Sequence, residues 1–209
     1  SESPIRYMPS LSTVVQNRLT TKWESVSSVA RTLHFTLTGR DNNATLNNTP
    51  QTNTDEMTVV VSSTVGPFLL SSQNTTDIGW QNGSGQTITW NVNNTNSLPG
   101  SSNVDIRLST DGGLTFPVTL ASNTPNDGSH TITVPADITA TNCRILIQPT
   151  GNIFYAVNKN PFAIGYTAKT TCDSYSFGNS FSIPFGNAFT TKTVNVPAST
   201  GTVSDVNVS

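Results

Sequence analysis

Hydrophobic and polar residues alternate most regularly between positions 104 and 134. In the stretch VDIRLS, apolar residues occupy every second position from Val104, and polar residues fall between them. This two-residue period is typical of a strand with one buried face. The DGG sequence at 111–113 favours a tight turn, because these residues tolerate positive φ. The segment therefore predicts a hairpin, and the Asn-Asp-Gly turn at 126–128 leads into a third strand.

Similar short strands are expected on both sides of this hairpin. Alternating or apolar runs bounded by turn residues lie at 68–70, 87–92, 143–147, 154–155 and 162–164. About seven short strands over roughly a hundred residues are the pattern of an immunoglobulin-like sandwich. The sequence therefore predicts an all-β fold, with a complete immunoglobulin-like antiparallel β-sandwich at residues 66–168.

Two further strands are expected ahead of this sandwich. Residues 29–38 alternate so that Leu33, Phe35 and Leu37 face inward, and residues 57–61 alternate in the same way. A long polar loop separates the two runs. We therefore expect them to pair as antiparallel neighbours.

The two ends of the chain predict incomplete modules. A short helix is expected after Ser10, where apolar residues fall at helical spacing. One helix and two strands are too little for an independent domain, so residues 1–65 are interpreted as the C-terminal part of a β-sandwich domain. After a polar linker, residues 169–209 show a new strand pattern and are interpreted as the first strands of another β module.

The composition argues against nucleic acid as a partner and against a membrane-spanning helix. Only 11% of the 209 residues are charged and the formal net charge is -2, so no basic face for nucleic acid is implied. No apolar run reaches the roughly 18 residues of a membrane-spanning helix, and we expect no membrane span. The first residues lack the apolar core of a signal peptide, as expected of a mature or internal polypeptide. Abundant Thr, Ser and Asn suit the wet faces of extracellular β-sandwiches.

The two cysteines, Cys143 and Cys172, allow two interpretations. They could form one disulfide, or they could be separate thiols, one packed near a strand and the other in a linker. Both interpretations stay open, because two cysteines are too few for a disulfide framework.

The titratable residues do not form a catalytic motif. His34 and His130 are the only histidines, and neither lies at a metal-ligand spacing. Ser129, His130 and Asp127 include the residue types of a hydrolytic triad, but neighbours on a turn rarely adopt triad geometry. We therefore expect no catalytic residue, no metal ligand and no cofactor in this chain.

The motif Ser109-x-Asp111-x-Gly113-x-Thr115-Phe116 resembles the Asp-box, a hairpin turn of sialidases and many other β proteins. The role of this motif is structural. Its carboxylate and hydroxyl groups form hydrogen bonds with backbone amides of the turn, and its aromatic ring anchors the hairpin. A sialidase would also need several propeller blades, which this chain does not offer. Calcium is a less favoured alternative without a spaced oxygen-ligand loop, and its candidate ligands are Asp55, Asp111 and Asp127.

Residues 66–164 as a whole resemble the immunoglobulin-like domain that follows the catalytic domain of secreted bacterial reprolysin-like zinc metallopeptidases. The resemblance is carried by ITWNV, VDIRLSTDGGLTFP, TPNDGS and GNIF. WESVSSVARTLHFTLTGRDN at 23–42 is similar to the end of another sandwich in these proteins. VPASTGTVSDVNVS looks like the beginning of a proprotein-convertase P-type domain. The resemblance implies a fragment of a larger protein, with zinc held only in a catalytic domain of that parent protein.

These observations predict a non-catalytic accessory region of a secreted multidomain protein, the parent being a zinc metallopeptidase. Such a region spaces, stabilises or docks other domains, or binds protein or glycan. The alternative is a cell-surface adhesin or structural β-sandwich protein without peptidase activity. The expected location is outside the cell or at its surface, and the expected partners are upstream domains, other proteins or glycans. Ligands are expected at the sandwich loops, with candidate residues Trp80, Asn82 and Asn94.

Overall fold

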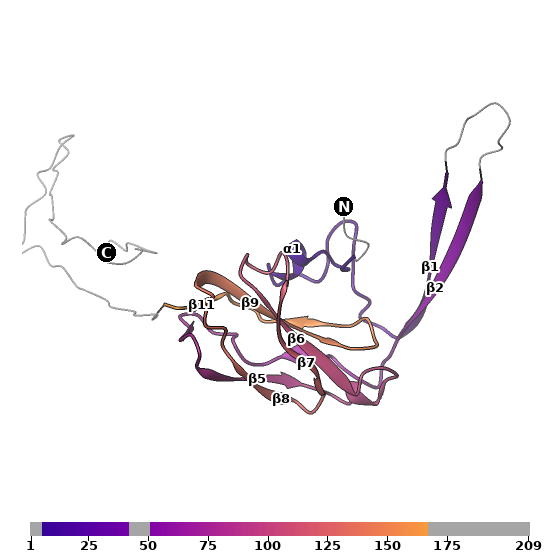
Figure 1. Ribbon diagram of the computed structural model, residues 1–209. Helices are drawn as coiled ribbons and strands as arrows, with labels where there is room; N and C mark the ends of the chain where they lie inside the picture. Colours follow the sequence, from indigo (N-terminus) through magenta and orange to yellow (C-terminus); the bar gives the residue numbers. More distant parts are fainter. Residues whose placement is uncertain (1–5, 42–50, 167–209) are drawn as a thin grey trace, which may run out of the picture. The chain divides into compact units, whose positions relative to one another are not determined.

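The computed structural model describes residues 6–41 and 51–166 of the chain (Figure 1). By internal contacts the chain divides into two units, Ser1–Lys169 and Thr170–Ser209. The second unit, and with it the module expected at 169–209, lies outside the described residues. Within the described part, no helix is long and apolar enough to cross a membrane.

Short strands between residues 69 and 164 build a sandwich of two sheets. They are β3 (Leu69–Leu70), β4 (Gly79–Trp80), β5 (Gly85–Asn91), β6 (Asn103–Ser109), β7 (Val118–Pro125), β8 (Ser129–Thr133), β9 (Ala140–Pro149), β10 (Ala156–Val157) and β11 (Phe162–Ile164), with a 3-10 turn η1 at Thr95–Ser97. The larger sheet has the order β4–β11–β9–β6–β7, with β10 also paired to β9, and the smaller has the order β3–β5–β8. Among the described strands, β11 and β4 pair in parallel and the other pairs are antiparallel. The expected all-β, immunoglobulin-like β-sandwich is confirmed.

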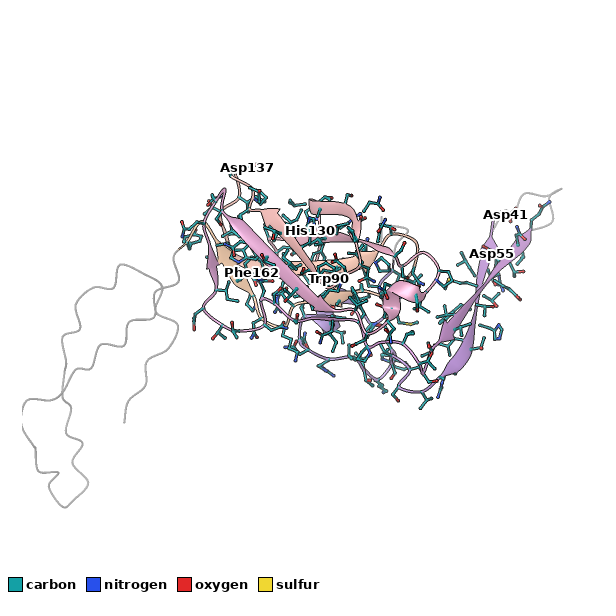
Figure 2. All side chains as sticks on the ribbon, turned by 90° about the horizontal axis from the view of Figure 1, so that it is seen from below. Asp41, Asp55, Trp90, His130, Asp137 and Phe162 are labelled. Atoms are coloured by element: carbon teal, nitrogen blue, oxygen red, sulfur yellow. The ribbon has the colours of Figure 1, made fainter. Side chains whose placement is uncertain are left out.

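The hydrophobic core lies between the two sheets. Val104, Ile106 and Leu108, which alternate along β6, are each 0% exposed, as the two-residue period predicts. Trp90 from β5 in the smaller sheet belongs to the same cluster. Figure 2 shows Trp90 and Phe162 inside the sandwich. The alternation read from the sequence therefore gives the inward face of β6 correctly.

Trp80 belongs to this core and not to a ligand-facing loop. It lies in β4, is 2% exposed, and packs on Phe162 with ring centroids 4.3 Å apart. The expectation that Trp80 faces a ligand is therefore wrong. The physical reason is the pairing of β4 with β11, which places Trp80 opposite Ile164 in the larger sheet.

The two strands expected near the N-terminus form a hairpin of β1 (Arg31–Arg40) and β2 (Thr52–Val61). They pair antiparallel as predicted, with Phe35 opposite Met57. β1 has the expected length of ten residues but lies two positions further along the chain, whereas β2 begins five residues earlier than expected. Both strands therefore take up part of the predicted polar loop. Leu37, expected to face inward, is 75% exposed, because among the described strands β1 and β2 pair only with each other.

Residues 6–17, which we call the strap, contain one short helix. The helix α1 (Leu11–Val14) follows Ser10 as predicted, but it is a single turn and Ser10 makes no side-chain capping bond. Glu24 holds the strap from the following segment, since its Oε2 accepts a bond of 2.9 Å from the Ser10 amide and its Oε1 pairs with Arg6. The bond from the Ser10 amide, followed by that from Arg6, lowers the pKa of Glu24.

Candidate functional site

The turn between β6 and β7 brings together the motif residues that the sequence singled out. Ser109 is the last residue of β6 and is fully buried. Its hydroxyl donates to Asp111 Oδ1 over 2.6 Å and accepts the Gly113 amide at 2.8 Å. One buried hydroxyl therefore joins the start of the turn to its far side.

The carboxylate of Asp111 binds the rest of the turn. Its Oδ1 accepts the amides of Leu114 and Thr115, each at 3.0 Å, and its Oδ2 accepts the Thr115 hydroxyl at 2.6 Å. Burial raises the pKa of Asp111, but the bonds from Ser109, Thr115 and Leu114 outweigh it and lower the pKa to about 2. The arrangement stabilises the ionised carboxylate as an acceptor for its own turn.

Two glycines let this turn fit against its surroundings. Gly112 and Gly113 have φ of 81° and 95°, which side chains rarely adopt. A Cβ on Gly113 would lie 2.5 Å from Val15 Cγ1 of the strap. The turn therefore packs closely on the strap as well as closing the hairpin.

Phe116 is buried as expected but does not join the main core. It is 8% exposed and is not a member of the cluster between the sheets. Leu146 in β9 is also fully buried outside that cluster, whereas its neighbours Ile145 and Ile147 belong to it. Since side chains alternate along a strand, Leu146 points to the outer face of the larger sheet. That outer face is therefore covered at this position.

The two histidines lie on different elements. His34 is exposed on β1, with Nδ1 3.4 Å from Thr58 Oγ1. His130 in β8 has Nδ1 2.8 Å from the hydroxyl of Thr124, a buried residue of β7. Asp127 instead accepts the Ser129 amide at 3.3 Å. The contacts of His130 thus run to β7, and those of Asp127 stay within its own turn.

The three candidate calcium ligands come from separate elements. Asp55 is on β2, Asp111 in the turn after β6, and Asp127 in the turn before β8 (Figure 2 labels Asp55 and His130). The described residues contain no group of three His, Cys, Asp or Glu side chains that could hold a metal ion. The structure does not bring these three carboxylates together as a site.

Asn82 and Asn94 are exposed in loops, where they were expected. The Asn82 amide donates to the carbonyls of Pro135, Ala136 and Ile138 at 3.1, 3.0 and 2.7 Å. Asn94 adopts a left-handed conformation, with φ of 62°, ahead of η1. The donors of Asn82 therefore hold a neighbouring loop.

Cys143 lies in β9 and is fully buried in the core. Its Sγ is 3.8 Å from the Ala140 carbonyl, and burial raises the pKa of the thiol to about 11. Cys143 has no disulfide partner among the described residues. Cys172 lies outside the described residues, so the Cys143–Cys172 pairing stays a prediction.

Sequence reasoning missed a set of buried polar groups on β9. Arg144 is buried, and burial lowers the pKa of its guanidinium. Its Nη1 donates to the Asn158 carbonyl at 2.8 Å, while Asn158 Oδ1 accepts the Ile145 amide at 2.7 Å. Among the described residues, no carboxylate forms an ion pair with Arg144. In a chain so rich in Asn, no local signal distinguishes Asn158.

A second buried asparagine ties the smaller sheet to a loop. Asn126 Oδ1 accepts the Trp90 indole N–H at 2.8 Å, and Asn126 Nδ2 donates to the Ser101 carbonyl at 3.0 Å. The Asn-Asp-Gly pattern predicted a turn here, but it gave no sign that Asn126 is buried. These partners satisfy both polar groups, as burial requires.

Comparison with known proteins adds a family. No curated protein and no solved structure matches the chain. A family model described as Kre9/KNH-like N-terminal Ig-like domain matches residues 72–183. The match spans more than half of the chain and includes β4 to β11 of the sandwich. The chain therefore belongs to the Kre9/KNH-like family, through its N-terminal Ig-like domain.

Proposed function

We propose that the chain is a non-catalytic structural region of a secreted or cell-surface protein, in which it spaces and stabilises neighbouring domains. The immunoglobulin-like sandwich suits this role, because it presents a firm scaffold with loops at its ends. Its parent protein is a zinc metallopeptidase under this proposal.

The contacts of Asp111 carry the proposal. Of the residues that the sequence singled out, Asp111 belongs to the most specific motif, the one that resembles the Asp-box. Both of its carboxylate oxygens bind groups of its own turn, at 2.6 to 3.0 Å. A carboxylate used in this way supports the fold, which favours a structural role for the motif over binding of a substrate.

The family match and the resemblance to peptidase domains support the proposed location and the proposed parent protein. The Kre9/KNH-like family is related to fungal glucan synthesis and the cell wall, which supports a location outside the cell. The resemblance of residues 66–164 to the immunoglobulin-like domain of reprolysin-like peptidases supports a peptidase parent. The zinc would be held by residues outside this chain. The resemblance of VPASTGTVSDVNVS to the beginning of a P-type domain supports such a domain in the parent protein.

An activity assay on the purified chain tests the non-catalytic role. Generic peptide and glycoside substrates would be incubated with the full chain, with and without a metal chelator. We expect turnover no higher than in a mock purification. Turnover that follows the chain through chromatography and is lost when His130 or Asp127 is replaced would overturn the proposal.

The parent gene tests the peptidase setting separately. A His-Glu-x-x-His stretch encoded upstream of Ser1 would support a zinc peptidase, because two histidines and a glutamate at this spacing form a zinc site with its general base. A parent gene without a zinc-binding motif would contradict the peptidase and leave the structural role intact.

The family match also favours a second candidate, a cell-wall binding module. This function is tested by sedimenting the full chain with insoluble β-glucan. Saturable depletion from the supernatant, absent with an unrelated insoluble polysaccharide, would support glucan binding. Equal depletion by both materials, or by neither, would reject it.

A further inference from the structure

We propose that the outer face of β9 is a docking site for a proline-containing peptide, and that the strap of the same chain is its resident ligand. The strap is residues 6–17. The site is formed by Arg144 of β9, by Tyr155 and Lys159 from the chain beyond it, and by Gly113 of the turn after β6. Figure 1 shows α1 of the strap beside β9.

The burial pattern of β9 shows that its outer face is covered. Residues 143–147 are all buried, although only alternate positions can point into the core. Arg144 and Leu146 occupy the outward positions, at 7% and 0% exposure. Pro9 of the strap is itself buried. A two-layer sandwich leaves this face to solvent, so the cover is an added layer.

The site holds the strap largely through its main chain. The Tyr155 hydroxyl donates to the Pro9 carbonyl at 3.1 Å, and Arg144 Nη2 donates to the Val15 carbonyl at 3.3 Å. Because every peptide offers such carbonyls, these bonds recognise the backbone rather than a sequence. Burial raises the pKa of Tyr155 to about 12, with Tyr7 and Glu24 adding to it, so the hydroxyl keeps the proton that it donates.

Three side chains of the strap, those of Tyr7, Pro9 and Asn17, add contacts that depend on its sequence. Pro9 fills a buried position, and the ring of Tyr7 meets that of Tyr155 edge to face, with centroids 5.1 Å apart and an angle of 80°. Asn17 Nδ2 adds a bond of 3.3 Å to the Lys159 carbonyl. The partner chemistry is therefore a peptide segment with an aromatic residue two positions before a proline.

The strap has little regular structure of its own, which suits a ligand that can leave. Its helix is one turn long and has no buried residue, and so short a helix is not stable by itself. Arg144 Nε has no hydrogen-bond partner in the described part of the chain. A surface pocket of about 340 Å³ remains between the strap and Leu114. Release of the strap would free the Arg144 guanidinium and the Tyr155 hydroxyl from the carbonyls that they bind.

A competition experiment on the full chain tests the proposal. The probe is a fluorescent synthetic peptide with the sequence of residues 6–17, and its anisotropy is measured against the wild type and a Pro9→Ala chain. In the wild type the tethered strap competes at an effective concentration in the millimolar range. The Pro9→Ala chain, whose own strap is weakened, is expected to bind the peptide about tenfold more tightly.

Control variants locate the binding. Tyr155→Phe, added to Pro9→Ala, removes the bond to the proline carbonyl of the peptide and is expected to weaken peptide binding. A peptide in which alanine replaces the residue equivalent to Pro9 is also expected to bind less well. If near-ultraviolet circular dichroism shows that Pro9→Ala impairs folding, Tyr7→Ala takes its place. This variant weakens strap binding by removing the ring contact with Tyr155. No saturable binding to either variant up to about 1 mM peptide, or binding that Tyr155→Phe leaves unchanged, would overturn the proposal.

Hydrogen exchange separates the same chain from a second copy as the source of the strap. Protection of the amides of residues 13–15 is expected to be independent of protein concentration. Protection that falls on dilution, together with a dimer by light scattering, would show that the strap comes from a second copy and would overturn the intramolecular assignment.

Discussion

Replacing Asp111 with asparagine removes the charge from the turn after β6 while keeping the shape of the side chain. The amide nitrogen cannot accept the Thr115 hydroxyl, and the remaining bonds lose their charge assistance. We expect the free energy of unfolding to fall by about 1–2 kcal/mol, measured by urea denaturation. Asp127→Asn is the matched control, because Asp127 accepts one long bond of 3.3 Å. An equal loss in both variants would contradict the role assigned to Asp111.

The same carboxylate predicts a dependence of stability on pH. The pKa of Asp111 is about 2 in the folded chain, below its ordinary value of 3.8. The unfolded chain therefore binds the proton first as pH falls, and the stabilisation present above pH 4 is lost between about pH 4 and 2. Allowing for solvent screening of this exposed turn, we expect a loss of about 1 kcal/mol relative to Asp111→Asn. Urea denaturation of both chains at several pH values measures it, and parallel curves would contradict it.

Cys143 predicts a slow chemical reaction. Its thiol is buried and its pKa is raised to about 11, so little thiolate is available at neutral pH. We expect iodoacetamide to leave Cys143 unmodified in the native chain and to alkylate it rapidly in urea, as followed by peptide mass spectrometry. Resistance in urea that disappears on adding a reductant would instead reveal a disulfide.

At the scale of elements, the β1–β2 hairpin is expected to be the least stable described sheet. Two strands without a covering layer are marginal in water, and among the described strands neither pairs with a third. We expect the paired amides of β1 to exchange with deuterium at least about tenfold faster than those of β6 and β9. Equal protection would show that another part of the protein covers the hairpin.

The elements differ in how far the sequence could predict them. Val104, Ile106 and Leu108 carry a local pattern, and their burial followed from it. Trp80 did not, because β4 is two residues long and its position depends on pairing with β11, far along the chain. Leu37 was misplaced because alternation tells which residues share a face, but it does not tell whether anything packs on that face.

The candidate site divides in the same way. The Asp111 turn is built from residues within a few positions of one another, so its motif was visible in the sequence. The contact of Arg144 with Val15 joins residues 129 positions apart, and that of Tyr155 with Pro9 joins residues 146 positions apart. No periodicity or motif reports such contacts, since both the strap and β9 look ordinary by themselves.

At the scale of the whole molecule, the strap changes the expected limits of the sandwich domain. Residues 66–168, the domain predicted from the sequence, lack the strap, and with it the buried Pro9 and the bonds to Arg144 and Tyr155. We expect that segment alone to be less stable than residues 6–168 by about 2 kcal/mol, the contribution of one buried aliphatic side chain. Urea denaturation compares the two, and equal stability would show that the strap adds nothing to the sandwich.

The parallel pairing of β4 with β11 has a consequence for synthesis of the protein. Trp80 pairs with Ile164 and packs on Phe162. The early strand β4 can therefore pair only after β11, the last strand described, has been made. A ribosome makes the chain from its N-terminus, and a nascent chain that stops before Phe162 leaves the Trp80 indole uncovered. The sandwich therefore completes its larger sheet only after nearly all of it has been translated. Until then, the uncovered indole is a target for chaperones.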